Sequence, residues 1–149
     1  MEERFKTFTV HIAKISRYIR KIKTMEMAEF DLKSPHVSCM YYLYKQNGEL
    51  TAKELCDICE EDKAAISRSI DALENSGYLQ CNSKTEKRYK SPLFLTEQGK
   101  VIGAKIAEKI DKVLDLAGDG LTNKQRAEFY KSLILISNNL QKVCDKYKE

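Results

Sequence analysis

The chain has 149 residues, of which 42% are hydrophobic and 32% are charged. This length suits one domain or one domain with an extension, and the composition excludes an intrinsically disordered chain. Charged residues interrupt the amino-terminal segment every few positions, which excludes a signal peptide and a membrane span there, so we expect a soluble cytoplasmic protein with no membrane partner. In a reducing cytoplasm the five cysteines are expected to remain thiols.

The net charge of +4 is too small to indicate nucleic-acid binding by itself, but the charges are unevenly distributed. Residues 1–25 carry seven Lys or Arg against two acids, and residues 81–100 carry five against two. The segment 51–80 is the reverse, with three basic and seven acidic residues. An interaction with DNA therefore requires the acids at positions 57–61 to face away from the groove.

Apolar residues in the first segment recur at alternating steps of three and four, which places them on one stripe of a helix. They are Phe5, Phe8, Ile12, Ile15, Ile19 and Ile22. The stripe is typical of an amphipathic helix that packs on a core, and its near-heptad spacing also suits a dimer interface. Both interpretations remain open from the sequence.

A second helix is predicted after residue 33. Ser34 is expected to cap it, with Pro35 at the first helical position, where a missing amide hydrogen does no harm. Asn47-Gly48 should end this helix, and Leu50 forms a short strand-like link to the next element.

Two further helices then follow with a tight turn between them. Thr51 and Glu54 have the spacing of a reciprocal capping box at the start of the first. Asp62 can cap the second, which Gly77 ends after Ser76. The apolar positions of this second helix step by four and three and should face inward: Ile66, Ile70 and Leu73.

The segments 78–81 and 92–96 read as the two strands of a hairpin, which forms a wing behind the helix-turn-helix. A long helix is expected to start after Thr96 and to run to the break at residues 116–120. A last helix should begin at Thr122, with an apolar stripe too wide for a surface helix. The stripe comprises Phe129, Leu133, Ile136, Leu140, Val143 and Tyr147.

These elements predict a mainly α fold with a small β-hairpin wing: a winged helix-turn-helix over residues 34–97. The segments 1–33 and 98–149 are predicted to be dimerisation helices, because they are more apolar than one small winged module can cover. We therefore expect a homodimer whose two recognition helices enter successive major grooves of duplex DNA about 34 Å apart, on a near-palindromic site.

The residues expected to contact DNA lie on the second helix of the helix-turn-helix and on the wing. With its apolar positions turned inward, this helix should present Lys63, Ala64, Ser67 and Arg68 to the groove. The wing gathers cations that suit phosphates or the minor groove: Lys84, Lys87, Arg88 and Lys90. The alternative to a DNA-binding surface is an ordinary charged helix face exposed to solvent. The hairpin that follows the helix disfavours this alternative, because a helix-turn-helix with a wing is typical of DNA-binding modules.

The segments LTAKELCDICEEDKAAISRSIDALENSGYL and PLFLTEQGK resemble the helix-turn-helix and the wing-to-helix signature of the MarR family of bacterial transcription regulators. In the second segment Leu95, Thr96 and Gly99 carry the resemblance, which extends over nearly the whole chain. The family's wing usually carries Asp-Xaa-Arg, whereas this chain has Glu86-Lys87-Arg88, one residue farther from Leu95. We expect Arg88 to be the minor-groove residue.

This resemblance implies a regulator, which we expect to be a repressor, and a pocket between the dimer helices and the winged module. Such a pocket takes small, often aromatic or anionic effectors. The candidate pocket residues by location are His11, Arg17, Met40, Tyr41 and Tyr42. Residues of these types in such positions are more often ordinary core or surface residues than ligand contacts.

The cysteines offer competing chemistry. Cys56 and Cys59 form a C-x-x-C pair, but no second pair of ligands completes a zinc site, and the pair lies at a helix end rather than at a helix start. We expect half-buried helix cysteines there, small core residues at Cys39 and Cys144, and an oxidisable thiol at Cys81, so a redox-sensing regulator is an open alternative.

No catalytic triad, phosphate-binding glycine loop or metal-binding histidine pair is present in the sequence, so we expect neither an enzyme nor a bound cofactor or metal. The alternative from another class is a winged-helix module that docks a protein. In that case the basic wing would be incidental, and binding to random duplex DNA would not depend on salt.

Overall fold

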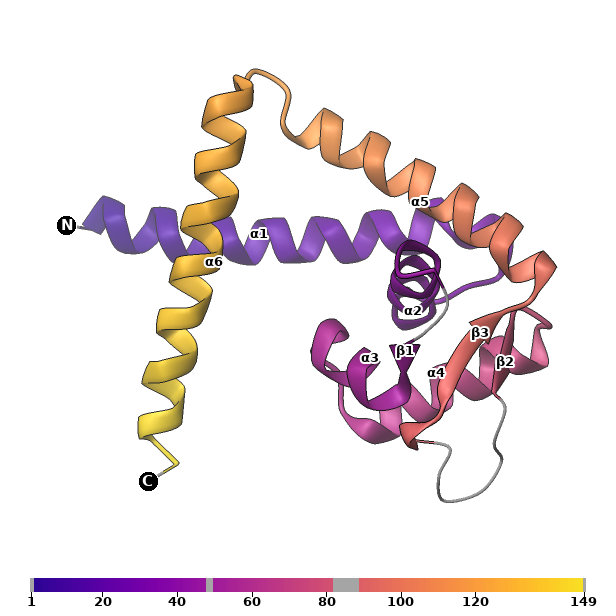
Figure 1. Cartoon of the computed structure of the whole chain (residues 1–149). Coiled ribbons are helices and arrows are strands. Elements are labelled where there is room, and N and C mark those ends of the chain that lie inside the picture. Colours follow the sequence, from indigo (N-terminus) through magenta and orange to yellow (C-terminus); the bar gives the residue numbers. More distant parts are fainter. Residues whose placement is uncertain (1, 48–49, 82–88, 149) are drawn as a thin grey trace. The chain divides into compact units, whose positions relative to one another are not determined.

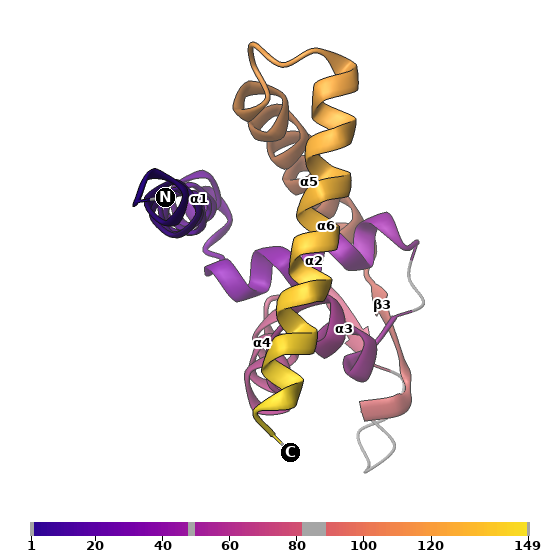
Figure 2. The same cartoon turned by 90° about the vertical axis from the view of Figure 1, so that its left-hand side faces the viewer.

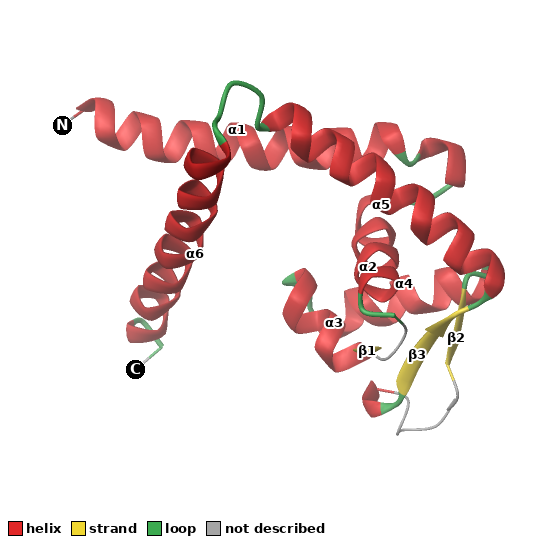
Figure 3. Ribbon diagram, turned by 45° about the horizontal axis from the view of Figure 1, so that its top comes forward, coloured by secondary structure: helices red, strands yellow, loops and turns green. Residues whose placement is uncertain are grey.

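The computed structural model describes residues 2–47, 50–81 and 89–148 (Figure 1). The chain divides into two compact units, residues 1–110 and 111–149. In chain order the elements are α1 (Glu2–Glu26), the 3-10 helix η1 (Ala28–Phe30), α2 (Ser34–Lys45), β1 (Leu50–Thr51), α3 (Ala52–Cys59), α4 (Lys63–Asn75), β2 (Leu79–Cys81), β3 (Pro92–Leu95), α5 (Glu97–Ala117) and α6 (Asn123–Lys146). Figure 3 shows the dominance of helices, which confirms the predicted fold class.

Side chains cap the helices of the winged module as the sequence predicts. At the start of α3 the Glu54 amide donates to Thr51 Oγ1 at 3.2 Å, and the Thr51 amide donates to Glu54 Oε2 at 2.7 Å. Asp62 Oδ1 accepts from the Ala65 amide at 2.7 Å at the start of α4. These bonds satisfy amide groups that have no partner within the helix itself.

The predicted cap of α2 is wrong by one residue. Lys33 is the N-cap, and Ser34 is already the first helical residue. The Lys33 amide donates to the Nδ1 atom of His36 at 3.3 Å, so the imidazole supplies the acceptor at this helix end, and the helix starts before Pro35.

A small antiparallel sheet lies beside the helix-turn-helix, with strand order β1-β3-β2. Leu79 faces Leu95 and Cys81 faces Leu93 across the predicted hairpin, and Leu50 of β1 pairs with Leu93 on the other side. The strand-like link at Leu50 is therefore a third strand. Because Leu93 and Leu95 alternate along β3 and are both buried, one face of the sheet lies on the core.

The core of the first unit lies between α2, α3, α4 and the sheet, and Ile106 of α5 reaches into it. Its fully buried side chains include Val37, Cys39, Met40, Leu43, Leu55, Ile66, Leu73, Leu93 and Ile106. Burial of each such side chain stabilises the fold by about 1.5–3 kcal/mol. This core is continuous from the helix-turn-helix to the start of α5.

None of the described side chains of helix α1 belongs to this core, whereas Met27, directly after the helix, is buried in it. The amino-terminal part of α1 extends away from the winged module (Figures 1 and 2), and the predicted stripe is exposed, from 74% at Phe5 to 37% at Ile22. At the other end, Lys109 of α5 pairs with Glu29 Oε1 at 2.8 Å and Glu26 Oε2 at 3.2 Å. These two carboxylates raise the pKa of Lys109 above its ordinary value.

The second unit contains the end of α5, the turn at Gly118–Gly120 and α6. Thr122 caps α6 as predicted, through the Gln125 amide at 3.2 Å. None of the described residues of α6 is buried within the chain, and its predicted apolar stripe is exposed along its length. No helix in the described ranges has the length and apolar character needed to cross a membrane.

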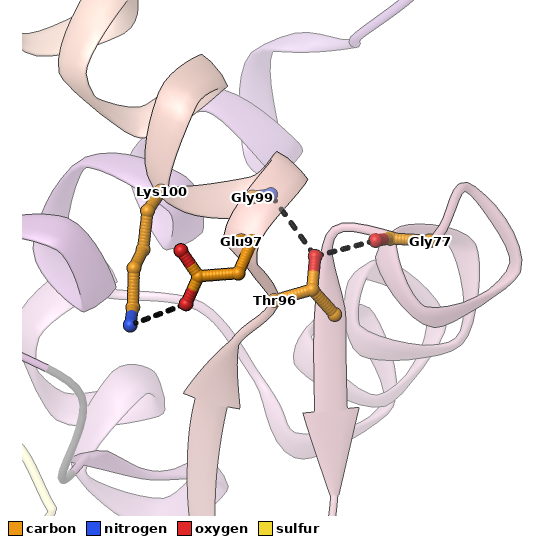
Figure 4. Close-up of polar contacts among 5 residues, drawn as sticks. All are labelled: Gly77, Thr96, Glu97, Gly99 and Lys100. Atoms are coloured by element: carbon orange, nitrogen blue, oxygen red, sulfur yellow. Dashed lines mark hydrogen bonds and ion pairs between the residues drawn. The ribbon is translucent and has the colours of Figure 1, made fainter.

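Thr96 joins the wing, the end of α4 and the start of α5 (Figure 4). Its Oγ1 donates to the Gly77 carbonyl at 2.6 Å and accepts from the Gly99 amide at 3.0 Å. The Thr96 amide in turn donates to the Tyr78 carbonyl at 3.1 Å. A Cβ atom on Gly99 would overlap that same Tyr78 carbonyl oxygen, so residue 99 must be glycine for α5 to approach this closely.

Replacing the hydroxyl of Thr96 tests this junction. Thr96→Val keeps the shape but leaves the Gly77 carbonyl and the Gly99 amide without their partner, so we expect unfolding to become easier by about 1–3 kcal/mol. Thr96→Ser, which keeps the oxygen, should lose far less. Urea unfolding followed by circular dichroism measures both variants, and equal losses would contradict the role of the hydroxyl.

Candidate nucleic-acid interface

Helix α4 has two chemically distinct sides. Ile66, Ile70 and Leu73 are buried as predicted, and Ser69, which the sequence pattern did not single out, is buried with them at 2% exposure. The opposite side is exposed and carries the four residues predicted to face DNA: Lys63, Ala64, Ser67 and Arg68. The structure thus brings these four side chains together on one solvent-facing surface near the start of the helix.

The turn between α3 and α4 sets the angle between the two helices of the motif. Glu60 adopts the left-handed conformation with φ of 54°, and its amide donates to the Cys56 carbonyl, which ends α3. Asp62 then caps α4 three residues into the turn. The acid at Glu60 is therefore placed by backbone geometry at a helix end, where it is exposed.

Glu61 lies on the side of the turn that faces α1. It lines a cavity of about 200 Å³ together with Arg20 and Lys23, two cations of α1. Glu61, one of the acids at positions 57–61, therefore lies near two cations within the first unit. The orientation of these acids relative to bound DNA remains a prediction.

Most of the wing cations named by the sequence lie outside the described residues: Lys84, Lys87 and Arg88. Lys90 is described, and it is exposed on the segment that leads into β3. Next to it, the aromatic residue Tyr89 is half-buried and packs on the core.

Tyr89 connects the wing to both helices of the helix-turn-helix. Its hydroxyl donates to Cys56 Sγ at 3.6 Å, and the Lys63 ammonium lies 4.5 Å from the centre of its ring. The hydrogen bond to Cys56 raises the pKa of Tyr89 above its ordinary value. The sequence analysis missed this residue; an aromatic side chain among the wing cations was the available signal.

The predicted effector residues differ in their exposure. His11 and Arg17 are exposed on α1, Met40 is completely buried in the core, and Tyr41 and Tyr42 are half-buried on α2. The cavity of about 200 Å³ between α1, α2 and the end of α3 is lined instead by Ser16, Ile19, Arg20, Lys23, Ser34, Pro35, Ser38, Cys59 and Glu61. Lys23 Nζ donates to Ser38 Oγ at 3.0 Å on its wall.

All five cysteines lie in the described ranges, and no disulfide joins them. Cys56 and Cys59 are half-buried at the end of α3, and Cys39 is completely buried, as predicted. Cys144 was predicted to be a core residue, but it is exposed, because α6 has no buried face within the single chain. Cys81 is half-buried in β2.

Comparisons with known proteins agree with this geometry. A model of the MarR family matches residues 30–88. The uncharacterized HTH-type transcriptional regulator YybA of Bacillus subtilis (strain 168) is 22% identical over 131 residues, which cover 88% of this chain and 87% of the relative.

Solved structures share the fold. NMB1585, a MarR family regulator from Neisseria meningitidis, matches with a TM-score of 0.80 and 19% identity, covering 96% of this chain and 97% of its own. The S. aureus MepR–DNA complex matches with a TM-score of 0.78 and 16% identity, covering 91% of this chain and 97% of its own. The chain thus contains a helix-turn-helix segment that matches the MarR family and shares the fold of MarR family regulators.

Proposed function

We propose that this protein is a transcription regulator of the MarR family, a cytoplasmic homodimeric repressor that binds near-palindromic operators in duplex DNA. The observation that carries the proposal is the exposed side of α4, opposite its buried side. The major groove accepts such a helix and shows it a distinct pattern of donors, acceptors and methyl groups at each base pair. In this proposal residues 34–97 read DNA, and residues 1–33 and 98–149 form the dimer.

The exposed residues of α4 have chemistry suited to base edges and phosphates. The small side chain of Ala64 permits close approach or contact with a thymine methyl, and Ser67 can bond a phosphate or a base. The guanidinium of Arg68 can donate two parallel hydrogen bonds to guanine. Lys63 can reach a phosphate while its contact with Tyr89 keeps it beside the wing.

The wing supplies the second contact. Lys90 is exposed and available to phosphates, and we propose the same role for Lys84 and Lys87. Arg88 is proposed to enter the minor groove. Because Tyr89 follows Arg88 directly and contacts both α3 and α4, the segment that leads into β3 is held beside α4.

The exposed apolar stripes of α1 and α6 support dimerisation. In α6 they include Phe129, Leu133, Ile136, Leu140 and Val143, each 37–49% exposed in the single chain. Soluble proteins rarely leave so much contiguous apolar surface in water, and a second copy of the chain would cover it. A symmetric dimer explains why the operator should be near-palindromic.

Release by an effector follows from the same arrangement. DNA affinity depends on the separation of the two recognition helices, so a ligand regulates binding if it favours one separation over another. A small aromatic or anionic effector is proposed, and the cationic cavity beside α1 is the feature that supports it. His11, Arg17, Met40, Tyr41 and Tyr42 remain candidates from sequence position.

Selection of bound DNA from random duplexes with the purified protein tests the proposal. A palindromic consensus is expected, and affinity for it should fall steeply as salt rises, because phosphate contacts release counterions. No enrichment together with salt-independent binding would favour the protein-docking alternative.

Arg68→Ala should weaken binding to the selected site by about 1–3 kcal/mol and relax base preference at one position in each half-site. Asn75→Ala, at the exposed far end of the same helix, serves as the control and should change affinity by less than about 0.5 kcal/mol. Fluorescence anisotropy measures both variants. Equal affinity of Arg68→Ala and the native protein would remove Arg68 from the interface.

Tyr89→Leu should weaken binding about 2- to 30-fold, because loss of the cation–π contact with Lys63 releases the wing segment that leads into β3. Tyr89→Phe keeps the ring and should remain close to the native affinity. The ring shifts the NMR signals of the Lys63 side chain, and this shift should vanish in Tyr89→Leu alone. Its persistence there would contradict the contact.

Leu140→Glu should weaken dimerisation about 10- to 100-fold, because a charge replaces an apolar side chain in the proposed interface. Asn138→Glu adds the same charge on the opposite side of α6 and is the matched control. Sedimentation velocity over a range of concentrations measures both. A monomeric native protein would refute the dimer itself.

A further inference from the structure

The residue of α6 that lies closest to its own chain is a cation. Arg126 is half-buried, whereas every other residue of α6 between Asn123 and Lys146 is exposed. A helix that packs on its own chain normally turns its apolar residues inward. Here Phe129, Leu133 and the rest of the apolar stripe are exposed, and an arginine is the side chain that the second unit covers.

Arg126 packs on the turn that follows α5. Its Nη2 donates to the Gly118 carbonyl at 3.4 Å, and that carbonyl also accepts from the Leu121 amide at 3.1 Å. Gly118 is buried, and a Cβ atom on it would lie 2.8 Å from Arg126 Nε. A cation is favourable at this place, because the last carbonyls of a helix carry partial negative charge. The guanidinium therefore joins the first turns of α6 to the end of α5.

This arrangement has a cost in stability. Arg126 Nε is buried and has no hydrogen-bond partner in the chain. A buried donor without an acceptor destabilises a fold, and an apolar side chain of similar shape avoids that penalty. The stability of the single chain alone therefore does not account for an arginine at this position.

The position of Arg126 in the helical repeat suggests what the arginine does. Arg126 precedes Phe129 by three residues, and the stripe then continues in steps of four and three. Arg126 therefore occupies the position where the next apolar residue of the stripe is expected. When helices with this repeat pack together, a polar residue at one such position specifies their register and number, although it lowers stability.

We propose that Arg126 is a positioning residue of the dimer: held on the Gly118 turn, it ends the apolar stripe of α6 and fixes the register in which a second copy packs on that stripe. The inference rests on the proposed function, which supplies the second copy. The stripe of α1, from Phe5 to Ile22, has the same alternating steps and is likewise exposed. A second copy brings both stripes again, and stripes with a common repeat pack on one another.

Three variants test this role. Arg126→Met removes the guanidinium and extends the apolar stripe by one position. Gly118→Ala keeps the arginine but displaces it from the turn, and alanine suits the backbone there because the φ of Gly118 is not positive. Lys131→Met removes a cation from an exposed position on the side of α6 away from the stripe, so it is the control.

Spin-label distances between the two copies report the register. The label is attached to Lys142→Cys, on the side of α6 away from the stripe, with the exposed Cys144→Ser removed as a competing target, and mass spectrometry verifies the labelled position. The otherwise native protein and Lys131→Met should give one distance. Arg126→Met and Gly118→Ala should give a second or broadened distance, because a slip of one heptad moves a helix by about 10 Å. One unchanged distance in both would overturn the proposal.

Thermal unfolding at equal concentrations distinguishes positioning from simple stabilisation. Arg126→Met should unfold at the native temperature or above it, because the buried donor without a partner is gone. Arg126→Lys keeps a cation at this position and should retain the single distance. A lower unfolding temperature of Arg126→Met together with an unchanged distance would make Arg126 an ordinary stabilising contact.

Sedimentation velocity and DNA binding separate this inference from the proposed function. In Arg126→Met the preference for the operator over random duplex should be lost, because the two recognition helices no longer keep one separation. A monomeric native protein would refute the proposed dimer and the register with it. A native dimer whose distance is the same in every variant refutes the inference alone. A native dimer that gives the expected distances but binds no DNA refutes the proposed DNA binding and leaves the role of Arg126.

Discussion

The hydroxyl of Thr96 is the contact on which the arrangement of the winged module depends. It donates to the Gly77 carbonyl just after α4 and accepts from the Gly99 amide in the first turn of α5, so one oxygen fixes the end of α4, the end of the wing and the start of α5 relative to one another. The missing Cβ of Gly99 allows the backbones to meet. A change in the direction of α5 within the first unit would therefore move the end of α4 as well.

The opposite end of the wing is held by a different kind of contact. There the hydroxyl of Tyr89 donates to Cys56 Sγ of α3, and its ring contacts the Lys63 ammonium of α4. These two contacts are longer and weaker than the hydrogen bonds of Thr96. The wing is thus held by short hydrogen bonds at Thr96 and by weaker contacts at Tyr89, which permit adjustment. The contacts at Tyr89 are next to the proposed DNA-contacting residues, where adjustment to a groove is required.

Local rules made the helix boundaries predictable. Thr51, Asp62 and Thr122 cap helices because their side chains reach amides three residues ahead, a relation that the sequence displays directly. The cap of α2 escaped prediction because His36, rather than Ser34, supplies the acceptor. The inward residues of α4 followed from helical period, so its outward surface followed as well.

Contacts between distant segments could not be predicted in this way. Tyr89 meets Cys56 across 33 positions, so this pair has no sequence pattern. The cavity beside α1 has the same origin, since its wall comes from three helices. Cys144 was misplaced because an apolar stripe does not show whether other residues of the same chain cover it, and here Cys144 is exposed.

The absence of buried residues among the described part of α6 has a consequence for the cell. If a second copy covers this helix, the stability of each copy is linked to its concentration by mass action. A newly made chain is then at its most vulnerable to proteases when copies are scarce. The amount of folded protein would therefore rise more steeply than its rate of synthesis.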